Sequence, residues 1–314
     1  MPKPLHAVFF GTSLAVGLLA CAASDEPAPV SSPPATTADP TEPGTPADPA
    51  PAPPAPPKKV PANGSPGCAA MAKTGNATID VAGTKRSLIL AVPKAYDPYT
   101  AYPIVFVLHS GGGTGASARS YFAFDTSGVE EKAVIVYPDA IGKNWDLDSP
   151  SATNKDVAFF DALVDHVKKT TCVDATRIFA TGTSQGAYLA NQLGCRRGDV
   201  LRGIAPHAGG GPWESTGGTW DAQGHLTSCQ GKPPAAMVFI GLADTNVNPT
   251  EGEKSVSHWS WANGCKVQTS PTSPDPCVAF AGCTKPVVAC RLPGVTHKMW
   301  AEGPKATWDF FSKL

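Results

Sequence analysis

Ser184 is the residue whose neighbours suit it best for chemistry. It lies at the centre of a Gly-x-Ser-x-Gly motif (residues 182–186), after an apolar β-branched run (residues 177–181) and before a run of helix formers. A chain of this length and composition is expected to contain about 0.2 such motifs by chance, so the flanking elements must show whether this motif is functional. A serine at a strand-to-helix turn exposes its hydroxyl at the helix N-terminus, and the two glycines permit the tight turn. We therefore predict that Ser184 is a nucleophile; the alternative is a glycine-bounded turn with an inert serine.

Asp244 and His297 are the candidate partners of this serine. A serine hydroxyl is a poor nucleophile until a histidine takes its proton, and that histidine needs an orienting carboxylate. With a serine turn of this kind, the carboxylate follows a later strand and the histidine comes near the chain end. Asp244 follows the apolar run 237–240, and His297 follows a turn at residues 294–296. The alternatives are a turn-forming aspartate and a structural histidine, but the ordered trio predicts a catalytic triad.

Two backbone N–H groups are expected to stabilise the oxyanion of an acyl-transfer reaction. One belongs to Gln185, the residue after the nucleophile. The other is expected in the glycine-rich loop Ser110-Gly111-Gly112-Gly113, which follows a strand ending at His109. We favour Gly111 over Gly112 as the donor; the alternative is that the loop is merely flexible.

Several other residues are weaker candidates for contact with a substrate. We expect His109 to organise its loop and His207 to be structural rather than to touch substrate. Trp145, Trp213 and Trp220 lie on loops expected at the edge of the active site. An aromatic plane there could stack on a phenolic, sugar or polyester group, and ordinary loop packing is the alternative for each.

The order of elements predicts an α/β domain with a mostly parallel sheet covered by helices. Nearly continuous apolar runs such as 104–108 are typical of central strands buried on both faces. One helix is expected to begin with Asp156 as its N-cap, one to run from the nucleophile to about Leu193, and one to lie near residues 304–313. The predicted strands are 87–92, 104–108, 133–137, 177–181, 201–205, 236–240 and 287–291.

The first 67 residues differ in composition from the rest of the 314-residue chain. Residues 22–67 hold 15 of the 33 prolines and no aromatic residue, so they predict a disordered linker. Residues 68–314 are about the size of one α/β domain. The formal net charge of −1 gives no reason to expect nucleic acid or an anionic membrane surface as a partner.

Residues 1–21 predict an export signal, with Lys3 before an apolar run that is too short to span a bilayer comfortably. The run ends in Ala20-Cys21, which resembles the lipobox of bacterial lipoproteins, where Cys21 would be lipidated. The alternative is an ordinary cleaved signal. We expect a secreted protein, and a proline-rich tether after Cys21 suits a domain held to the envelope by that lipid.

The other cysteines predict disulfides rather than a metal site. An even number of them in an exported chain is typical of a disulfide framework, and their spacing does not match a zinc site. The four late cysteines lie within 26 residues and are expected to pair among themselves, and the pairings Cys68 with Cys172 and Cys195 with Cys229 are our hypotheses for the rest. The eight cysteines are Cys68, Cys172, Cys195, Cys229, Cys265, Cys277, Cys283 and Cys290.

Together the motifs of residues 68–314 resemble the secreted polyhydroxybutyrate depolymerase and feruloyl or acetylxylan esterase group of the α/β-hydrolases. The resemblance implies the α/β-hydrolase fold, the triad of Ser184, Asp244 and His297, and a carboxylic ester as substrate. The chain departs from the group at Ser110, where glycine is usual, and at Met299, where the usual tryptophan is displaced to Trp300. The matching segments are 108–113, 137–138 with Trp145, Asp156, 173–174, 177–186, 193–195, 241–247, 261–265 and 294–297.

We therefore expect a secreted serine esterase that acts through an acyl-enzyme, most of all on feruloyl or acetyl esters of plant polysaccharide or on short-chain polyester. Trp145 and Trp300 are the predicted substrate-binding residues. No metal and no organic cofactor are expected, and we expect a monomer. Two alternatives remain: a serine peptidase of the same fold, and a non-catalytic surface-binding lipoprotein.

Overall fold

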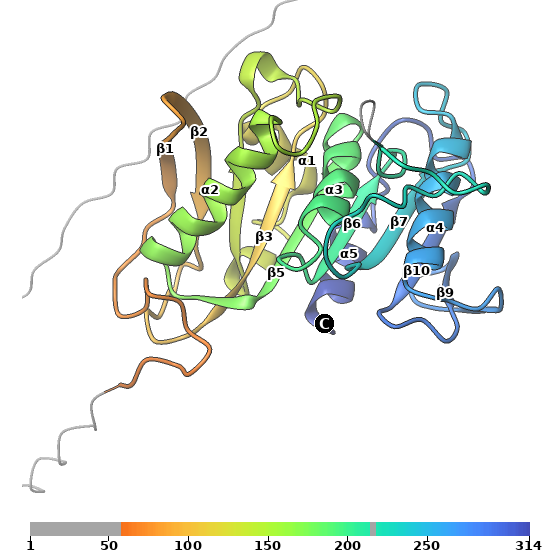
Figure 1. The fold of residues 1–314 in the computed structure, drawn as a ribbon. Coiled ribbons are helices and arrows are strands. Elements are labelled where there is room, and N and C mark those ends of the chain that lie inside the picture. The colour runs from red at the N-terminus through yellow and green to blue at the C-terminus, as the bar shows by residue number, and fades with distance from the viewer. Residues whose placement is uncertain (1–57, 214–217) are drawn as a thin grey trace, which may run out of the picture. The chain divides into compact units, whose positions relative to one another are not determined.

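The computed structural model describes residues 58–213 and 218–314, and in them one mixed sheet forms the centre of the domain Pro56–Leu314 (Figure 1). The order across this 10-stranded sheet of the described residues is β1-β2-β4-β3-β5-β6-β7-β10-β9-β8. The six strands from β4 to β10 in this order are parallel, and the two strands at each edge pair antiparallel. The strands are β1 (Gly75–Val81), β2 (Thr84–Ala91), β3 (Tyr102–Leu108), β4 (Val134–Pro138), β5 (Val173–Thr183), β6 (Gly203–His207), β7 (Ala235–Gly241), β8 (Thr269–Pro271), β9 (Cys277–Phe280) and β10 (Val287–Leu292).

Helices cover both faces of this sheet, and each face has its own apolar core. The helices are α1 (Gly115–Phe122), α2 (Lys155–Thr170), α3 (Gln185–Arg196), α4 (Pro249–Ala262) and α5 (Gly303–Ser312), with 3-10 turns η1 (Val129–Glu131) and η2 (Ile141–Lys143). In Figure 1, α2, α3 and α4 lie on one face, and α1 and α5 lie on the other. Successive residues of β3 alternate between the two cores: Ile104 and Phe106 face α2 and α3, while Val105 faces α1 and α5. A central strand buried on both faces explains the continuous apolar run in the sequence.

The seven predicted strands and three predicted helices are confirmed, with ends that differ by a few residues. The prediction that Asp156 caps a helix is wrong. The side chain of Asn154 accepts hydrogen bonds from the N–H groups of Asp156 and Val157 and is the N-cap of α2. Asp156 is instead bound in a buried ion pair with Arg86. Five further elements, β1, β8, β9, α1 and α4, have weaker apolar periodicity and were not predicted.

The described end of the predicted linker is ordered and packs on the domain. The hydroxyl of Ser65 donates to the carbonyl of Thr171 at 2.7 Å and accepts from the N–H of Val173. Asn63 donates to the carboxylate of Asp174 at 2.7 Å. Asn63 and Ser65 therefore pack on the domain, because their side chains find partners at Thr171 and on β5.

The eight cysteines of the domain form four disulfides, as the sequence predicted. Both hypothetical pairs are confirmed, Cys68–Cys172 and Cys195–Cys229. The four late cysteines pair among themselves, as Cys265–Cys283 and Cys277–Cys290.

The predicted export signal, most of the predicted linker and Cys21 lie outside the described residues. In residues 58–213 and 218–314, no helix is both long enough and apolar enough to cross a membrane.

We predict that the long-range disulfide stabilises the domain more than the short-range one does. Closing a loop of about 100 residues removes about 4.7 kcal/mol of unfolded-state entropy, against about 3 kcal/mol for a loop of about 15 residues. The separations are 104 residues for Cys68–Cys172 and 13 for Cys277–Cys290. Urea unfolding of the two double Cys→Ser variants measures the difference, and an equal or smaller loss for the Cys68–Cys172 variant would contradict this account.

Candidate active site

Ser184 lies at a sharp turn between β5 and α3. Its backbone angles are φ 53° and ψ −121°, a region that residues other than glycine rarely adopt. Its N–H donates to the carbonyl of His207 on the neighbouring strand β6 at 3.0 Å. A Cβ at Gly186 would lie 2.3 Å from the carbonyl oxygen of Leu108, so only glycine permits the close contact of α3 with β3. The turn therefore places the Ser184 hydroxyl at the N-terminus of α3.

Three side chains from three separate strand ends are joined by hydrogen bonds at this turn. The Nε2 atom of His297 lies 3.0 Å from Oγ of Ser184, and its Nδ1 atom lies 2.8 Å from a carboxylate oxygen of Asp244. Because an ionised carboxylate only accepts, Nδ1–H is the donor to Asp244, and Nε2 accepts from the Ser184 hydroxyl. Ser184 follows β5, Asp244 follows β7 and His297 follows β10, so the order predicted from the sequence corresponds to a contiguous chain of contacts.

The surroundings of Asp244 keep it ionised. Burial would raise the pKa of this carboxyl group, but the hydrogen bonds from His297 and from the N–H groups of Val247 and Asn246 outweigh it. The pKa of Asp244 therefore lies below its ordinary value. A fixed carboxylate holds the imidazole of His297 in the tautomer in which Nε2 can accept a proton.

The loop after β3 lies against the first turn of α3. A Cβ at Gly111 would be 3.4 Å from the side-chain oxygen of Gln185, so the two predicted oxyanion donors are neighbours. The N–H of Gly112 donates to the carbonyl of Lys143, and the N–H of Gly113 donates to the carbonyl of Ser110. The N–H groups of Gly112 and Gly113 are thus already bonded within the protein. Of the three glycines in this loop, Gly111 is the one whose N–H is left to donate to a ligand.

Trp145 does not lie at the rim of the site, contrary to the prediction that it binds substrate. Its side chain is 4% exposed, its Nε1–H donates to the carbonyl of His109 at 2.8 Å, and its ring lies 4.6 Å from the imidazole of His109. Its backbone N–H donates to the side-chain oxygen of Gln185 at 3.0 Å. Trp145 therefore supports the segments that carry the two predicted oxyanion donors, because it bonds both the loop after β3 and the start of α3.

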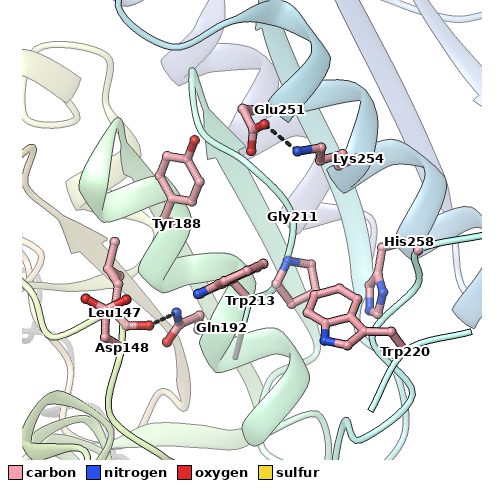
Figure 2. A pocket seen from close by; sticks show the side chains of 12 residues that line it. Leu147, Asp148, Tyr188, Gln192, Gly211, Trp213, Trp220, Glu251, Lys254 and His258 are labelled. Atoms are coloured by element: carbon pink, nitrogen blue, oxygen red, sulfur yellow. Dashed lines mark hydrogen bonds and ion pairs between the residues drawn. The ribbon is translucent and has the colours of Figure 1, made fainter. Parts of the chain in front are cut away.

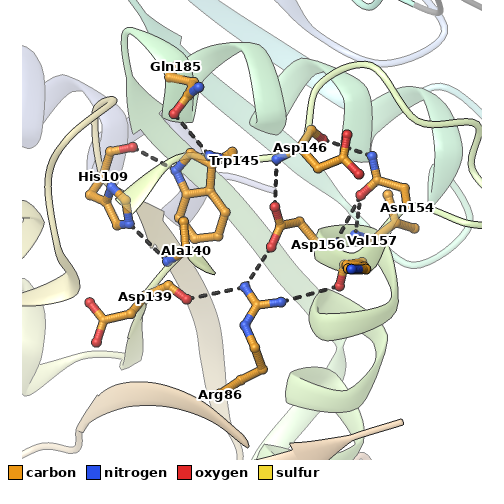
Figure 3. Close-up of polar contacts among 11 residues, drawn as sticks. Arg86, His109, Asp139, Ala140, Trp145, Asp146, Asn154, Asp156, Val157 and Gln185 are labelled. Atoms are coloured by element: carbon orange, nitrogen blue, oxygen red, sulfur yellow. Dashed lines mark hydrogen bonds and ion pairs between the residues drawn. The ribbon is translucent and has the colours of Figure 1, made fainter. Parts of the chain in front are cut away.

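A buried ion pair supports this loop in turn (Figure 3). Arg86 of β2 and Asp156 of α2 are 2% and 4% exposed and lie 2.5 Å apart. Arg86 also donates to the carbonyl of Asp139, and its guanidinium lies over the ring of Phe159. The second carboxylate oxygen of Asp156 accepts from the N–H of Asp146, next to Trp145. The ion pair thus fixes both ends of the segment 139–146 that carries Trp145.

The buried histidines near the site are structural. His109 donates from Nδ1 to the carbonyl of Ser110 and accepts at Nε2 from the N–H of Ala140, so it organises its loop as predicted. His207 stacks on Phe239 and bonds Thr307, away from solvent. Burial lowers the pKa of His109, and it lowers the pKa of His207 to about 3. Both imidazoles are therefore neutral at ordinary pH.

The remaining aromatic candidates are placed as follows. Trp300 is partly buried and packs near Phe239 on the α1 and α5 side of the sheet. Trp213 and Trp220 are 50% and 40% exposed and lie side by side, with ring centroids 5.6 Å apart. Within the part of the chain that the structure describes, no three His, Cys, Asp or Glu side chains form a group that could hold a metal ion.

A hydrogen bond that was not predicted from the sequence joins the loop after β3 to the turn at Ser184. The hydroxyl of Ser110 lies 2.8 Å from the hydroxyl of Thr183, the residue before the nucleophile. Ser110 stands where the resembling group has glycine, and this departure was the available signal. The serine adds a hydrogen bond between the oxyanion loop and the turn that holds Ser184.

We predict that replacing one member of the buried ion pair lowers the free energy of unfolding more than replacing both members does. Asp156→Leu leaves the Arg86 charge buried without its partner and is expected to lower the free energy of unfolding by about 3–5 kcal/mol. The double variant Arg86→Met with Asp156→Leu is expected to lose less, because neither charge is then left buried. Urea unfolding measures both. Asp309→Ala is the control. Its ion pair with Lys305 is exposed, so this substitution should lower the free energy of unfolding by less than about 1 kcal/mol. A double variant as unstable as the single one would contradict the interpretation.

We predict that the free energy of unfolding falls as the pH is lowered from 7 to 4. Unfolded histidines bind a proton below about pH 6.5, whereas burial lowers the pKa of His207 to about 3 and that of His258 to about 4. The unfolded state therefore takes up more protons, and each group contributes a slope of about 1.4 kcal/mol per pH unit. His207→Gln should reduce the slope by that amount in urea unfolding at pH 6, 5 and 4; an unchanged slope would show that His207 is not kept neutral by the fold.

Comparisons with known proteins find similar proteins named as esterases. No protein-family model matches the chain. A probable feruloyl esterase C from Aspergillus niger and a feruloyl esterase C from Emericella nidulans are each 27% identical over 266 residues, which cover 79% of this chain and 90% of each relative. A feruloyl esterase D from Neurospora crassa is 23% identical over 76% of this chain and 85% of its own length.

Solved structures share the fold. An acetyl xylan esterase from Aspergillus awamori superposes with a TM-score of 0.61 at 15% identity, over 76% of this chain and 100% of the other. A feruloyl esterase module from Clostridium thermocellum, complexed with sinapinate, gives a TM-score of 0.53 at 14% identity over 83% of this chain and 94% of the other. The relatives and the shared fold support the predicted resemblance to the feruloyl and acetylxylan esterase group of the α/β-hydrolase superfamily.

Proposed function

We propose that this chain is a serine esterase that hydrolyses carboxylic esters through a covalent acyl-enzyme. The observation that carries the proposal is the continuous chain of hydrogen bonds from Ser184 through His297 to Asp244, at the turn between β5 and α3. The curated relatives support the same reaction class, since their names describe feruloyl esterases. Ser184, His297 and Asp244 are the catalytic residues of this proposal.

In the first half of the reaction, Oγ of Ser184 attacks the ester carbonyl carbon while Nε2 of His297 takes its proton. The negative charge that develops on the carbonyl oxygen is stabilised by the N–H groups of Gly111 and Gln185. The C–O bond to the alcohol then breaks, and His297 returns the proton to the leaving alkoxide. Asp244 stabilises the imidazolium throughout without itself becoming protonated.

In the second half, water takes the place of the alcohol. His297 removes a proton from the water, the hydroxide attacks the acyl carbon, and the oxyanion occupies the same site at Gly111 and Gln185. The bond to Ser184 breaks, the proton on His297 returns to Oγ, and the free acid leaves. The chemistry needs only these side chains, the two backbone donors and water.

For the substrate, we propose feruloyl or acetyl esters of plant polysaccharide before short-chain polyester of the polyhydroxybutyrate type. The relatives are named for feruloyl esters, and the fold is shared with an acetyl xylan esterase. A peptidase of the same fold is the second candidate, distinguished by cleavage of peptide amides. A non-catalytic surface-binding protein is disfavoured because the hydrogen-bond chain from Ser184 to Asp244 is complete.

We further propose that the protein acts outside the cytosol. Four disulfides within one domain persist in an oxidising compartment and are rare in the cytosol. An export signal at residues 1–21 and lipidation of Cys21 are the proposed route and anchor, and radiolabelled palmitate incorporation in wild-type protein but not in Cys21→Ser would test the anchor.

We predict that Ser184→Ala lowers kcat for p-nitrophenyl acetate by at least about 10⁴-fold, because it removes the hydroxyl that is bonded to His297 and that forms the acyl-enzyme in this mechanism. Asp244→Asn should also lower kcat by about 10⁴-fold, because an amide favours the wrong imidazole tautomer of His297. Steady-state hydrolysis measures both. Hydrolysis by Ser184→Ala at the wild-type rate would overturn the proposed mechanism.

The substrate class is decided by comparing three compounds with one preparation of enzyme. We expect turnover of methyl ferulate or of acetylated xylan, and little release of acid from polyhydroxybutyrate film. Turnover of the polyester alone would replace the proposed substrate class. Cleavage of a peptide amide at a comparable kcat/KM would favour the peptidase.

A further inference from the structure

The loop that carries His297 is bound to α1 through the hydroxyl of Tyr121. This loop runs from the end of β10 at Leu292 to the start of α5 at Gly303. The phenolic oxygen of Tyr121 accepts a hydrogen bond from the backbone N–H of Met299, the second residue after His297. The bond joins residues 178 positions apart in the sequence, so no local pattern predicts it.

The loop has one other backbone anchor near His297, and it precedes the imidazole. The N–H of Ala243, in the loop after β7, donates to the carbonyl of Val295 at 3.0 Å. Among the described residues, the bond to Tyr121 is the one hydrogen bond that ties the backbone of residues 296–299 to a segment outside their own loop. His297 therefore lies between two attachments, one on the loop after β7 and one on α1.

A tight turn links the position of Met299 to that of the imidazole. The N–H of Lys298 donates to the carbonyl of Thr296 at 2.7 Å, which closes a γ-turn with His297 as its central residue. Because this turn fixes the backbone at His297, a displacement of Met299 also moves the ring. The Nε2 and Nδ1 atoms lie 3.0 and 2.8 Å from their partners, so a shift of about 1 Å away from either partner would break that bond.

Apolar packing also holds the loop, but it is less directional. Val295, Met299 and Trp300 are partly buried and pack against the core on the α1 and α5 side of the sheet. Apolar contacts depend on the area that they bury and have no preferred direction, whereas a hydrogen bond needs its donor and acceptor to be nearly aligned. The bond to Tyr121 is therefore the directional contact that follows His297.

The helix that bears Tyr121 is itself fixed at both ends. Phe122 is fully buried and packs edge-on against His207, with the ring centroids 5.5 Å apart. At the start of α1, the N–H of Gly115 donates to the carboxylate of Asp139 at 2.6 Å. The phenolic oxygen is thus presented to the loop from a rigid support.

The same helix begins at the oxyanion loop. Its N-cap is Thr114, the residue after Gly113, and Tyr121 lies about 10 Å further along the helix axis. The helix α1 therefore connects the loop of the predicted oxyanion donor to the loop of the predicted base.

Tyr121 does not line the cavity between α3 and α4 (Figure 2). That cavity has a volume of about 370 Å³, and its lining includes Tyr188, Trp213 and Trp220. The helices α3 and α4 cover the face of the sheet opposite to α1. A change at the Tyr121 hydroxyl therefore leaves this cavity unaltered, so an effect on activity would not come from its shape.

We propose that Tyr121 is a positioning residue: its hydroxyl orients the loop of His297 so that the imidazole meets both of its partners in the triad. This inference rests on the proposed function for the role of His297 as general base. Tyr121→Phe keeps the ring and removes only the oxygen that accepts from Met299, so it isolates the hydrogen bond. Because Tyr121 is 43% exposed, the substitution leaves no cavity in the core.

The first test compares Tyr121→Phe with Tyr102→Phe by steady-state hydrolysis of p-nitrophenyl acetate. The hydroxyl of Tyr102 also accepts from a backbone N–H, that of Asp97 at 3.2 Å, but Tyr102 lies at the opposite end of β3 from the oxyanion loop. We expect Tyr121→Phe to lower kcat by at least about tenfold with KM within about twofold, since a misplacement of about 1 Å can slow a reaction by about 10²-fold. We expect Tyr102→Phe to change kcat by less than about twofold. Urea unfolding checks that each variant is folded.

A second comparison shows whether Tyr121 acts through His297. In the His297→Ala background the base is gone, so adding Tyr121→Phe should not lower the remaining rate further. A general loss of folded protein, or a lost contact with the substrate, would instead lower the rate by the same factor in both backgrounds.

Proton NMR of the free enzyme makes the inference testable without a substrate. The proton between Nδ1 of His297 and the carboxylate of Asp244 is expected far downfield in the wild type and in Tyr102→Phe. In Tyr121→Phe we expect this signal to weaken or disappear, because the imidazole is no longer held against the carboxylate.

The inference is overturned by any of four results for Tyr121→Phe: a kcat within about twofold of the wild type, a rise in KM in place of the fall in kcat, an equal effect in the absence of His297, or an unchanged downfield proton. An equal loss of kcat in Tyr102→Phe would overturn it as well. An inactive wild type whose downfield proton still depends on Tyr121 would reject the proposed function and support the positioning role.

Discussion

The strained turn at Ser184 is the constraint on which the site depends. A non-glycine residue at φ 53° and ψ −121° costs on the order of 1–3 kcal/mol and persists only where the surroundings fix it. Here its N–H is bound to the carbonyl of His207, and the glycines on either side let α3 approach β3 within contact distance. The packing that stabilises this strained turn thereby exposes the hydroxyl of Ser184, the proposed nucleophile, at the N-terminus of α3.

The close approach of α3 to β3 also brings the loop after β3 to the first turn of the helix, and these two segments carry the proposed oxyanion donors. Gly111 then lies beside Gln185, and the Ser110 and Thr183 hydroxyls bond each other. Trp145 bonds both parts: its backbone N–H donates to the side chain of Gln185, and its Nε1–H donates to the carbonyl of His109. The segment that carries Trp145 is fixed by the Arg86–Asp156 ion pair, so a charge pair between β2 and α2 positions groups beside Ser184.

Local sequence patterns were enough to predict the central strands, the turn at Ser184 and the order of the three catalytic candidates. These patterns failed where a residue far away in the chain determines which bonds a side chain makes. Asn154 and Asp156 are equally good helix caps in isolation, and only Arg86, 70 residues earlier in the chain, assigns Asp156 to an ion pair and leaves the cap to Asn154. Trp145 stands on a loop, as predicted, but its burial depends on stacking against His109, which periodicity does not encode. The edge strands β1, β8 and β9 are exposed or half-exposed for most of their length and so lack the apolar signal that marks a central strand.

The histidines of the domain illustrate how environment, rather than residue type, selects a base. His109, His207 and His258 are buried, and burial lowers the pKa of each, so none of them can take a proton easily at neutral pH. His297 has a side chain that is 23% exposed and a buried carboxylate at 2.8 Å from Nδ1. In the proposed mechanism that carboxylate compensates the imidazolium that forms when Ser184 loses its proton, whereas His207 is bonded to the hydroxyl of Thr307. Unlike these three buried rings, His297 is bonded both to a carboxylate and to the Ser184 hydroxyl, as the proposed mechanism requires of its base.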